Sequence, residues 1–391
     1  MLLTMDILYE YQEELIAQTD SNFYRNLFSR LNWNQRMFGI TGLRGTGKTT
    51  MLLQYLKTHV SEKESVLYVT ADHPWFYENS LAELARTFVK YGGKILLIDE
   101  IHKYPNWSKE LKNIYDGLPR LQVIFTASSV LDILSGEADL SRRALTYELP
   151  GLSFREYLEL IYREKFSVIS LEKLLKSPKE ITSPVLEKIK PLPLFREYLK
   201  QGYFPFIISE KAPAFHQKLN QVINTTMEID LQTIKKYNYS SIIKFKKLLG
   251  IIAESAPFEP NISRIAQRLD LGRDTVKLYL QNLDKARLLN LISYPTKGIA
   301  YLQKPDKIYL ENTNFSYSLK TSPNTGTLRE TFFLNQLRNA DYNIHLSKKG
   351  DFIAYTGELG SMKKDLKRLK KKKKIDRNSK FYKPKLKYKF V

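Results

Sequence analysis

Short apolar runs alternate with amphipathic segments between Arg36 and about Pro150. The runs are short enough for buried strands, and they lie at Met37–Thr41, Ser65–Thr70, Lys94–Asp99 and Leu121–Ala127. Between them, apolar side chains recur at helical spacing in Thr49–Val60, Ser80–Tyr91 and Ser108–Leu118. Apolar strands separated by helices predict a parallel sheet covered on both faces, so this part of the chain is expected to have an α/β fold. Residues 1–35 are expected to form short helices that lead into the first strand.

The rest of the chain follows a mostly helical pattern. Residues 152–240 are lysine-rich and helical, with interruptions at Pro191-Leu-Pro193 and Gly202-Tyr-Phe-Pro205. Two further apolar helical stripes lie on 262–269 and 273–285, and strand-like segments follow at 288–294 and 307–310. Two helices joined by a tight turn and followed by a hairpin predict a winged helix. A last helix is expected at 328–338.

A phosphate-binding motif stands between the first predicted strand and the helix that follows it. The pattern G-x-x-x-x-G-K-[ST] is fulfilled by Gly42-Leu43-Arg44-Gly45-Thr46-Gly47-Lys48-Thr49. Its glycines let the backbone N–H groups face phosphates, and the helix N-terminus adds partial positive charge. Lys48 is expected to reach the β- and γ-phosphates, and Thr49 to offer its hydroxyl to Mg²⁺. The predicted ligand is ATP with Mg²⁺, bound by residues 42–49 and by Thr50 beside them.

A second motif ends the third predicted strand. In Lys94-Ile-Leu-Leu-Ile-Asp99-Glu100, four apolar residues stop where two acids begin. Ligands of α/β sheets bind at this end of the strands. Asp99 is expected near the metal, and Glu100 is expected to orient and deprotonate the attacking water. The motif predicts hydrolysis of ATP, and the alternative is a slow nucleotide-operated switch or a DNA-binding regulator with little turnover.

Two weaker signals follow. The strand Gln122–Ser129 ends in small polar residues, of which Thr126 or Ser128 is a candidate for contact with the γ-phosphate or the attacking water. Helix capping by Ser128 or Ser129 is the alternative. Arg142 and Arg143 precede the strand-like segment 144–149, and either is a candidate finger that stabilises transition-state charge, in cis or from a neighbouring subunit. A surface salt bridge is the alternative.

With these motifs the chain resembles the prokaryotic AAA+ ATPases, in particular a bacterial and archaeal group with a P-loop ATPase, a helical lid, a winged helix and a C-terminal domain. The resemblance covers residues 40–205 and continues more weakly to about 340. It implies Asp99 as the metal-side acid, Glu100 as the catalytic glutamate, 126–128 as the sensor strand and Arg142 or Arg143 as the finger. The residues that carry it are the P-loop, Leu97–Pro105 with Trp107, Phe125–Ser129, Leu149–Tyr157 and Gly202–Pro205.

The family's last domain sometimes resembles a restriction-endonuclease core. Glu330 and Asp351 are candidates for its first two acids, but Gly360 stands where its catalytic lysine belongs, so nuclease activity is not expected. The expected division of the chain is a P-loop ATPase domain with N-terminal helices at 1–150, an α-helical lid at 151–240, a winged-helix domain at 241–315, and a C-terminal remnant with a basic tail at 316–391.

Charge adds two candidate surfaces for DNA. Of the formal net charge of +21 on 391 residues, +13 lies in 361–391, which holds 13 Lys and 2 Arg against 2 Asp. Such a tail is either a solvated arm or a contact for a polyanion. The outer face of the second winged-helix helix carries Arg273, Lys277 and Gln281, which suit DNA. Docking of a client protein is the alternative for this domain.

Composition excludes several classes of site. The chain has no cysteine, which excludes disulfides and thiolate zinc sites. Its histidines are scattered, with no spacing suited to zinc. The first residues are acidic and lack a basic region, and the apolar runs are far shorter than the roughly 20 residues that cross a bilayer. The protein is expected to be cytoplasmic and without membrane contact.

Overall fold

The first part of the chain forms a parallel sheet in the computed structural model, which describes residues 2–58, 65–127, 140, 142–169, 173, 176–231, 237–255, 257–295, 305–320, 323–340, 342–347 and 350–355. The sheet has five strands in the order β2-β3-β4-β1-β5, and all neighbours pair in parallel. The strands are β1 Met37–Thr41, β2 Val66–Thr70, β3 Ile95–Asp99, β4 Gln122–Ala127 and β5 Leu145–Glu148. The predicted α/β sheet is therefore confirmed, and β4 separates the strand before the P-loop from the strand that ends in Asp99.

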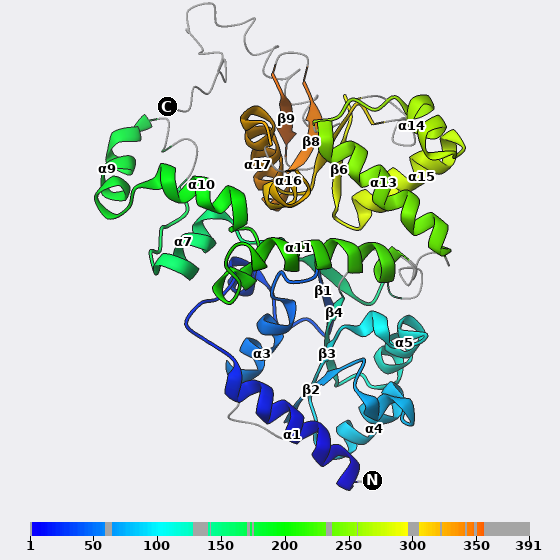
Figure 1. Cartoon of the computed structure of the whole chain (residues 1–391). Coiled ribbons are helices and arrows are strands. Elements are labelled where there is room, and N and C mark those ends of the chain that lie inside the picture. Colours follow the sequence, from blue (N-terminus) through cyan, green and yellow to red (C-terminus); the bar gives the residue numbers. More distant parts are fainter. Residues whose placement is uncertain are drawn as a thin grey trace, which may run out of the picture.

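Helices cover both faces and one edge of this sheet (Figure 1). They are α1 Leu2–Gln18, α2 Asn26–Arg30, α3 Lys48–Thr58, α4 Leu81–Lys90 and α5 Trp107–Gly117, with 3-10 turns η2 Pro74–Tyr77 and η3 Ile101–Lys103. Side chains of α4 and α5 form one apolar cluster with the sheet, and those of α3 form another. α1 packs beside β2, where Gln12 Oε1 accepts a hydrogen bond from Tyr68 N at 2.6 Å.

The prediction of short N-terminal helices is wrong for the first of them. α1 has 17 residues. Its buried Met5 and Leu8 belong to one apolar cluster, and Leu15 and Ile16 pack against the other. A helix that borders the β2 edge of the sheet needs this length because it contacts both clusters.

A helical segment follows the sheet, consisting of α7 Phe154–Tyr162, α9 Pro178–Lys188, α10 Pro191–Gln201, η4 Pro205–Ile208, α11 Ala214–Thr225 and the π-helical turn η5 Thr226–Asp230. Pro191 begins α10 instead of interrupting a helix, because proline fits the first helical position. Figure 1 shows α11 between the sheet and the last third of the chain.

The last third, here called the C-terminal group, consists of α13 Tyr239–Ser255, α14 Ile262–Leu269, α15 Arg273–Lys285, β6 Leu289–Ile292, β7 Lys307–Leu310, α16 Thr313–Leu319, α17 Thr325–Asn339, β8 Asn343–Leu346 and β9 Phe352–Tyr355. β6 and β7 form an antiparallel hairpin, and Phe258 bridges to Ile308 beside it. The sequence did not indicate the second hairpin, β8–β9. Gly360, residues 361–391 and residues 296–304 lie outside the described residues.

One apolar cluster joins the helical segment to the C-terminal group. It contains Phe215 and Leu219 of α11, Phe245 of α13, Val276 of α15 and Phe315 of α16. The expected domain boundaries after residues 240 and 315 fall inside α13 and α16, because apolar packing continues across both. No helix within the described ranges is long and apolar enough to cross a membrane.

Candidate nucleotide-binding site

The P-loop curls between β1 and α3 through three glycines with positive φ. Gly42, Gly45 and Gly47 have φ values of 148°, 79° and 96°. A side chain at Gly42 would collide with the carbonyl oxygen of Leu149, so only glycine fits there. Lys48 is the first residue of α3, and its Nζ donates to the carbonyl oxygens of Gly42 and Leu43 at 2.9 Å each. Burial lowers the pKa of Lys48, while nearby Glu100 and Asp99 oppose that shift.

A buried arginine outside the motif supports this loop. Arg25 donates to the carbonyl oxygens of Thr46, Pro150 and Gly151, and its Nε lies 3.0 Å from Glu156 Oε1. Glu156 also closes the capping box of α7 with Ser153. The P-loop is therefore tied to the point where the chain leaves the sheet for the helical segment. No sequence motif marks Arg25, which lies 131 residues from its carboxylate partner.

Asp99 lies at the C-terminal end of β3 and accepts three side-chain hydrogen bonds. The hydroxyls of Thr49 and Tyr68 donate to its Oδ2 at 2.7 and 3.1 Å, and the hydroxyl of Thr126 donates to its Oδ1. Burial raises the pKa of Asp99, although the bonds from Thr126 and Thr49 oppose that shift. A desolvated carboxylate beside a hydroxyl suits Mg²⁺, which takes one or two protein oxygens and completes its shell with phosphate and water.

Glu100 follows β3 in the left-handed conformation, with φ 52° and ψ 39°. Its Oε2 lies 3.3 Å from Arg44, 3.5 Å from Lys103 and 3.6 Å from His102 Nε2. Burial by itself would raise the pKa of Glu100, but Lys48 and the other neighbouring positive charges outweigh it and lower the pKa. The carboxylate is therefore ionised at neutral pH and able to accept a proton.

Thr126 connects the two acids. It lies on β4, paired with Ile40 of β1, and its hydroxyl accepts from Glu100 N at 2.9 Å while it donates to Asp99. This buried hydroxyl therefore holds the two acids relative to each other, and its contact with the γ-phosphate or the attacking water stays a prediction. Ser128 and Ser129 lie outside the described residues.

The helical segment packs directly on the P-loop. Leu43 is buried in the apolar cluster that holds Phe204 and Phe215. A Cβ on Gly45 would lie 3.0 Å from the ring of Phe206. Arg44 Nη2 lies 2.9 Å from Asp230 Oδ1, on η5. Asp230 was not predicted from the sequence, although its place on the apolar stripe of Ile223 and Met227 was a signal, since a lone acid on a buried face needs a partner.

The two candidate finger arginines lie away from the P-loop of their own chain. Both arginines come just before β5, whereas the P-loop follows the C-terminal end of β1. Since β1 and β5 are parallel, the arginines lie at the N-terminal end of the strands and the P-loop lies at the C-terminal end. Arg143 forms a two-pronged ion pair with Asp116, with both hydrogen bonds at 2.9 Å. Arg142 is exposed. Neither arginine therefore lies at the P-loop end of the strands in its own chain, and the assignment of a finger stays a prediction.

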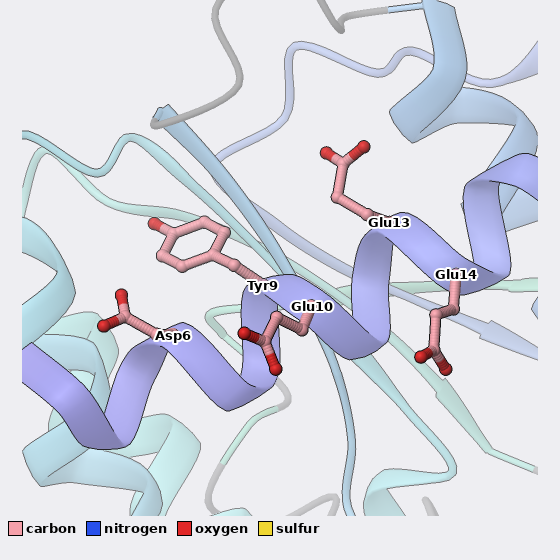
Figure 2. A pocket seen from close by; sticks show the side chains of 5 residues that line it. All are labelled: Asp6, Tyr9, Glu10, Glu13 and Glu14. Atoms are coloured by element: carbon pink, nitrogen blue, oxygen red, sulfur yellow. The ribbon is translucent and has the colours of Figure 1, made fainter.

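Two further sets of acidic side chains lie outside the predicted motifs of the nucleotide site. Glu330 accepts a hydrogen bond from the Tyr309 hydroxyl at 2.7 Å, and Asp351 is exposed before β9. Among the described residues, no group of three or more His, Cys, Asp and Glu is arranged to hold a metal ion. A hollow of about 520 Å³ lies on α1, and Figure 2 shows the side chains that line it: Asp6, Tyr9, Glu10, Glu13 and Glu14. Its four carboxylates would repel phosphates.

The strand order and the P-loop geometry agree with a family match. Residues 34–158 match the family model described as AAA domain. This part of the chain has the fold of an AAA-type P-loop ATPase. It contains the P-loop, Asp99, Glu100 and Thr126. Residues 192–322, from α10 to α16, match a model described as a domain of unknown function, DUF8612.

Comparisons of the chain with individual proteins find similarities at low sequence identity. The uncharacterized protein MJ1637 of Methanocaldococcus jannaschii is 28% identical in an alignment 278 residues long that covers 68% of this chain. The chain spans 58% of the length of that relative. Among solved structures, the Walker-type ATPase PABY2304 of Pyrococcus abyssi is 14% identical, with a TM-score of 0.48 over 76% of this chain and 95% of that chain. AMPPCP-bound DnaA of Aquifex aeolicus is 16% identical, with a TM-score of 0.26 over 72% and 88%.

Proposed function

We propose that this protein binds ATP with Mg²⁺ at residues 42–50 and hydrolyses it to ADP and phosphate. The observation that carries the proposal is the arrangement of three strand ends. β1 leads into the P-loop, β3 presents Asp99 and Glu100, and Thr126 on the intervening β4 bonds to both acids. Thr49, at the start of α3, is joined to Asp99 at 2.7 Å. The phosphate-binding loop, Asp99 and Glu100 thus lie together at the C-terminal ends of neighbouring parallel strands.

Each group has a distinct role in the proposed reaction. The backbone N–H groups of the loop and the ammonium of Lys48 hold the phosphates. Thr49 and Asp99 would hold Mg²⁺, which supplies neutralisation of phosphate charge. Glu100 Oε2 accepts the proton of the attacking water as the water oxygen forms its bond to the γ-phosphorus and the bond from that phosphorus to the β,γ-bridging oxygen breaks. Thr126 fixes the backbone of Glu100 while it holds the carboxylate of Asp99.

The first test separates binding from chemistry. Mg-ATP at about 100 times its Kd should stabilise the wild type by about 2.7 kcal/mol in a thermal scan. Lys48→Ala should lose this gain, whereas Lys57→Ala is the matched control, because Lys57 stands on the same helix and bonds to Thr19. Glu100→Gln should keep the gain and release phosphate at least about 100-fold more slowly. An equal thermal gain in the wild type and Lys48→Ala, or undiminished turnover in Glu100→Gln, would remove the basis of the assignment.

A slowly hydrolysing switch is the second candidate, and one observation favours it. Glu100 is already engaged by Arg44, which leaves it less available as a base. Steady-state phosphate release by the wild type distinguishes the two candidates. Multiple turnover at about 1 per second or faster, as in ordinary enzymes, supports the enzyme, and near-absent turnover with tight binding supports the switch.

Nucleotide turnover would act on the rest of the chain through a lid and a winged helix. We include the helical segment as the lid, and α13–α15 with the β6–β7 hairpin as the winged helix. The order of these helices and the antiparallel hairpin support the second assignment. DNA is one proposed partner of its exposed Arg273 and of the lysine tail, and a client protein is the other. Arg142 or Arg143 remains a proposed finger for the site of a neighbouring subunit.

A further inference from the structure

Arg25 joins the P-loop to two segments outside the nucleotide motifs. Its Nη1 donates to the carbonyl oxygen of Thr46 at 2.5 Å. Its Nη2 donates to the carbonyl oxygens of Pro150 and Gly151 at 2.7 and 3.0 Å. Its Nε donates to Oε1 of Glu156 on α7 at 3.0 Å. One guanidinium therefore holds together the P-loop, the residues that follow β5 and the first helix of the lid.

Both charges of this ion pair are buried, so the position of one depends on the other. The side chains of Arg25 and Glu156 are each 6% exposed. Backbone N–H groups of Asn26 and Ser153 also donate to the Glu156 carboxylate, at 2.8 Å each. Burial by itself would raise the pKa of Glu156, but the charge of Arg25 and these hydrogen bonds lower it. Removing one partner of such a pair leaves a buried charge unpaired, which is strongly destabilising.

Anchoring the Thr46 carbonyl orients a backbone N–H of the P-loop. A peptide group is planar and trans, so the N–H of Gly47 points opposite to the Thr46 carbonyl oxygen and away from Arg25. Gly45 and Gly47 flank Thr46 with φ values of 79° and 96°, and glycine tolerates other conformations as readily, so the loop alone does not fix this peptide. Backbone N–H groups of this loop are the proposed phosphate ligands. Arg25 thus orients one of them before a nucleotide arrives.

The same guanidinium holds the segment on which the P-loop rests. Leu149 N donates to the carbonyl oxygen of Thr41 at 2.7 Å. The Leu149 carbonyl oxygen would lie 2.4 Å from a Cβ on Gly42, so the loop packs closely on this residue. Pro150 and Gly151 come next in the chain, and the guanidinium bonds to both. The beginning and the middle of the P-loop are therefore held relative to one short segment after β5.

We propose that Arg25 and Glu156 are positioning residues that keep the P-loop in its phosphate-binding shape. They act through the backbone of the loop, so the affinities for ADP and for ATP depend on them equally. A loop that is ordered in advance spares the nucleotide the cost of ordering it. Coupling of this kind is reciprocal, so bound nucleotide in turn stabilises the ion pair and the start of α7. The inference rests on the proposed function of the same site, and it adds to that site a residue from the first helix of the lid.

Substitution of Arg25 tests the dependence of affinity on the pair. Arg25→Met should weaken Mg-ADP and a non-hydrolysable Mg-ATP analogue alike, by about tenfold each, as expected when one charge-assisted hydrogen bond no longer orders the loop. Isothermal titration calorimetry measures both affinities at a temperature where circular dichroism shows each protein to be folded. Arg25→Lys keeps the charge beside Glu156 but lacks the fork of donors that reaches three carbonyl oxygens. It should unfold at a higher temperature than Arg25→Met and still bind both nucleotides weakly, and it carries the comparison if Arg25→Met does not fold.

Arg36→Met is the matched control. Arg36 also donates to backbone carbonyl oxygens, those of Tyr115 and Leu118, but it precedes β1, whereas the P-loop follows that strand. Its substitution should lower the unfolding temperature and leave both nucleotide affinities unchanged. A contribution to stability alone would make the Arg25 and Arg36 variants behave in the same way.

Hydrogen–deuterium exchange tests the reciprocal effect. In the wild type, saturating Mg-ADP should slow exchange of the Asn26 and Ser153 amides several-fold, because both donate to Glu156. In Arg25→Lys, also saturated, the same nucleotide should give no such protection. The internal control is the amide of Ser80, which belongs to a capping box of the same kind at the start of α4 and should exchange at an unchanged rate.

The outcomes distinguish this role from the proposed function. Unchanged affinities in the Arg25 variants, an equal loss in Arg36→Met, a loss confined to the ATP analogue, or no protection of the Asn26 and Ser153 amides overturns the positioning role. Nucleotide binding by the wild type in any of these cases leaves the proposed binding of ATP standing. Absence of nucleotide binding in the wild type overturns both.

Discussion

The hydroxyl of Thr126 should be worth far more to stability than its methyl group. Thr126→Val keeps the shape of the side chain but removes both hydrogen bonds, so Glu100 N loses its acceptor and Asp99 loses one of its three donors. A buried group left without a partner costs about 1–3 kcal/mol, and more when it is charged. The bond to Asp99 is buried and the bond from Glu100 N is partly buried, so we expect a loss of about 2–3 kcal/mol in the free energy of unfolding.

Thr126→Ser separates the hydroxyl from the rest of the side chain. It keeps both bonds and removes one methyl, for which the expected loss is about 1 kcal/mol. Urea unfolding followed by tryptophan fluorescence is a suitable assay, because the ring of Trp107 lies 6.3 Å from that of Phe125, next to Thr126 on β4. If the valine and serine variants unfold within about 0.5 kcal/mol of each other, the hydroxyl does not hold the two acids.

Two further predictions concern pH and salt. Burial lowers the pKa of His102 from 6.5 to about 4, so the unfolded chain takes up a proton that the folded chain does not. Stability should therefore fall as the pH drops from about 6.5 towards 4, by about 3 kcal/mol in total, and His102→Gln should remove that part of the slope in urea titrations; identical slopes would exclude this cause. If the protein binds DNA, deleting residues 361–391 should make the slope of log affinity against log salt concentration shallower by about 0.9 for each phosphate that the tail neutralises. The double substitution Arg273→Ala and Lys277→Ala should mainly reduce discrimination between DNA sequences, by about 1–3 kcal/mol. An unchanged slope after the deletion would leave the tail as a solvated arm.

The sequence predicts most of the sheet because its strands are apolar on both faces. β1 begins and ends where its apolar run does, and β3 is one residue shorter than predicted. The P-loop and the acids that end β3 were also readable, since their chemistry requires fixed residue types at fixed spacing. Contacts between residues far apart in the chain could not be predicted from the sequence. Asp230 reaches Arg44 across 186 residues, and only the packing of η5 against the P-loop brings the two together.

The C-terminal group shows a similar contrast. The helices α14 and α15 were predicted from one buried stripe each, and both are found where the stripes lie. The hairpin β8–β9 was missed because its four-residue strands are half-buried and mix polar with apolar side chains, which gives no clear period. Short mixed strands depend on their tertiary partners, here α17 and β6.

Leu43 occupies a variable position of the phosphate-binding motif, yet it is buried in an apolar cluster made largely by residues after 200. The first family match ends at residue 158 and the second begins at residue 192, which would suggest two separable modules. Packing contradicts that division. If the region after residue 192 were replaced by that of a relative, residue 43 would have to be compatible with the new region. If the P-loop alone were moved into another protein, the Leu43 side chain would have no apolar cluster to pack against. The phosphate-binding loop of this protein therefore carries two features within six residues: Lys48 at the start of α3, and Leu43 in the apolar packing with residues after 200.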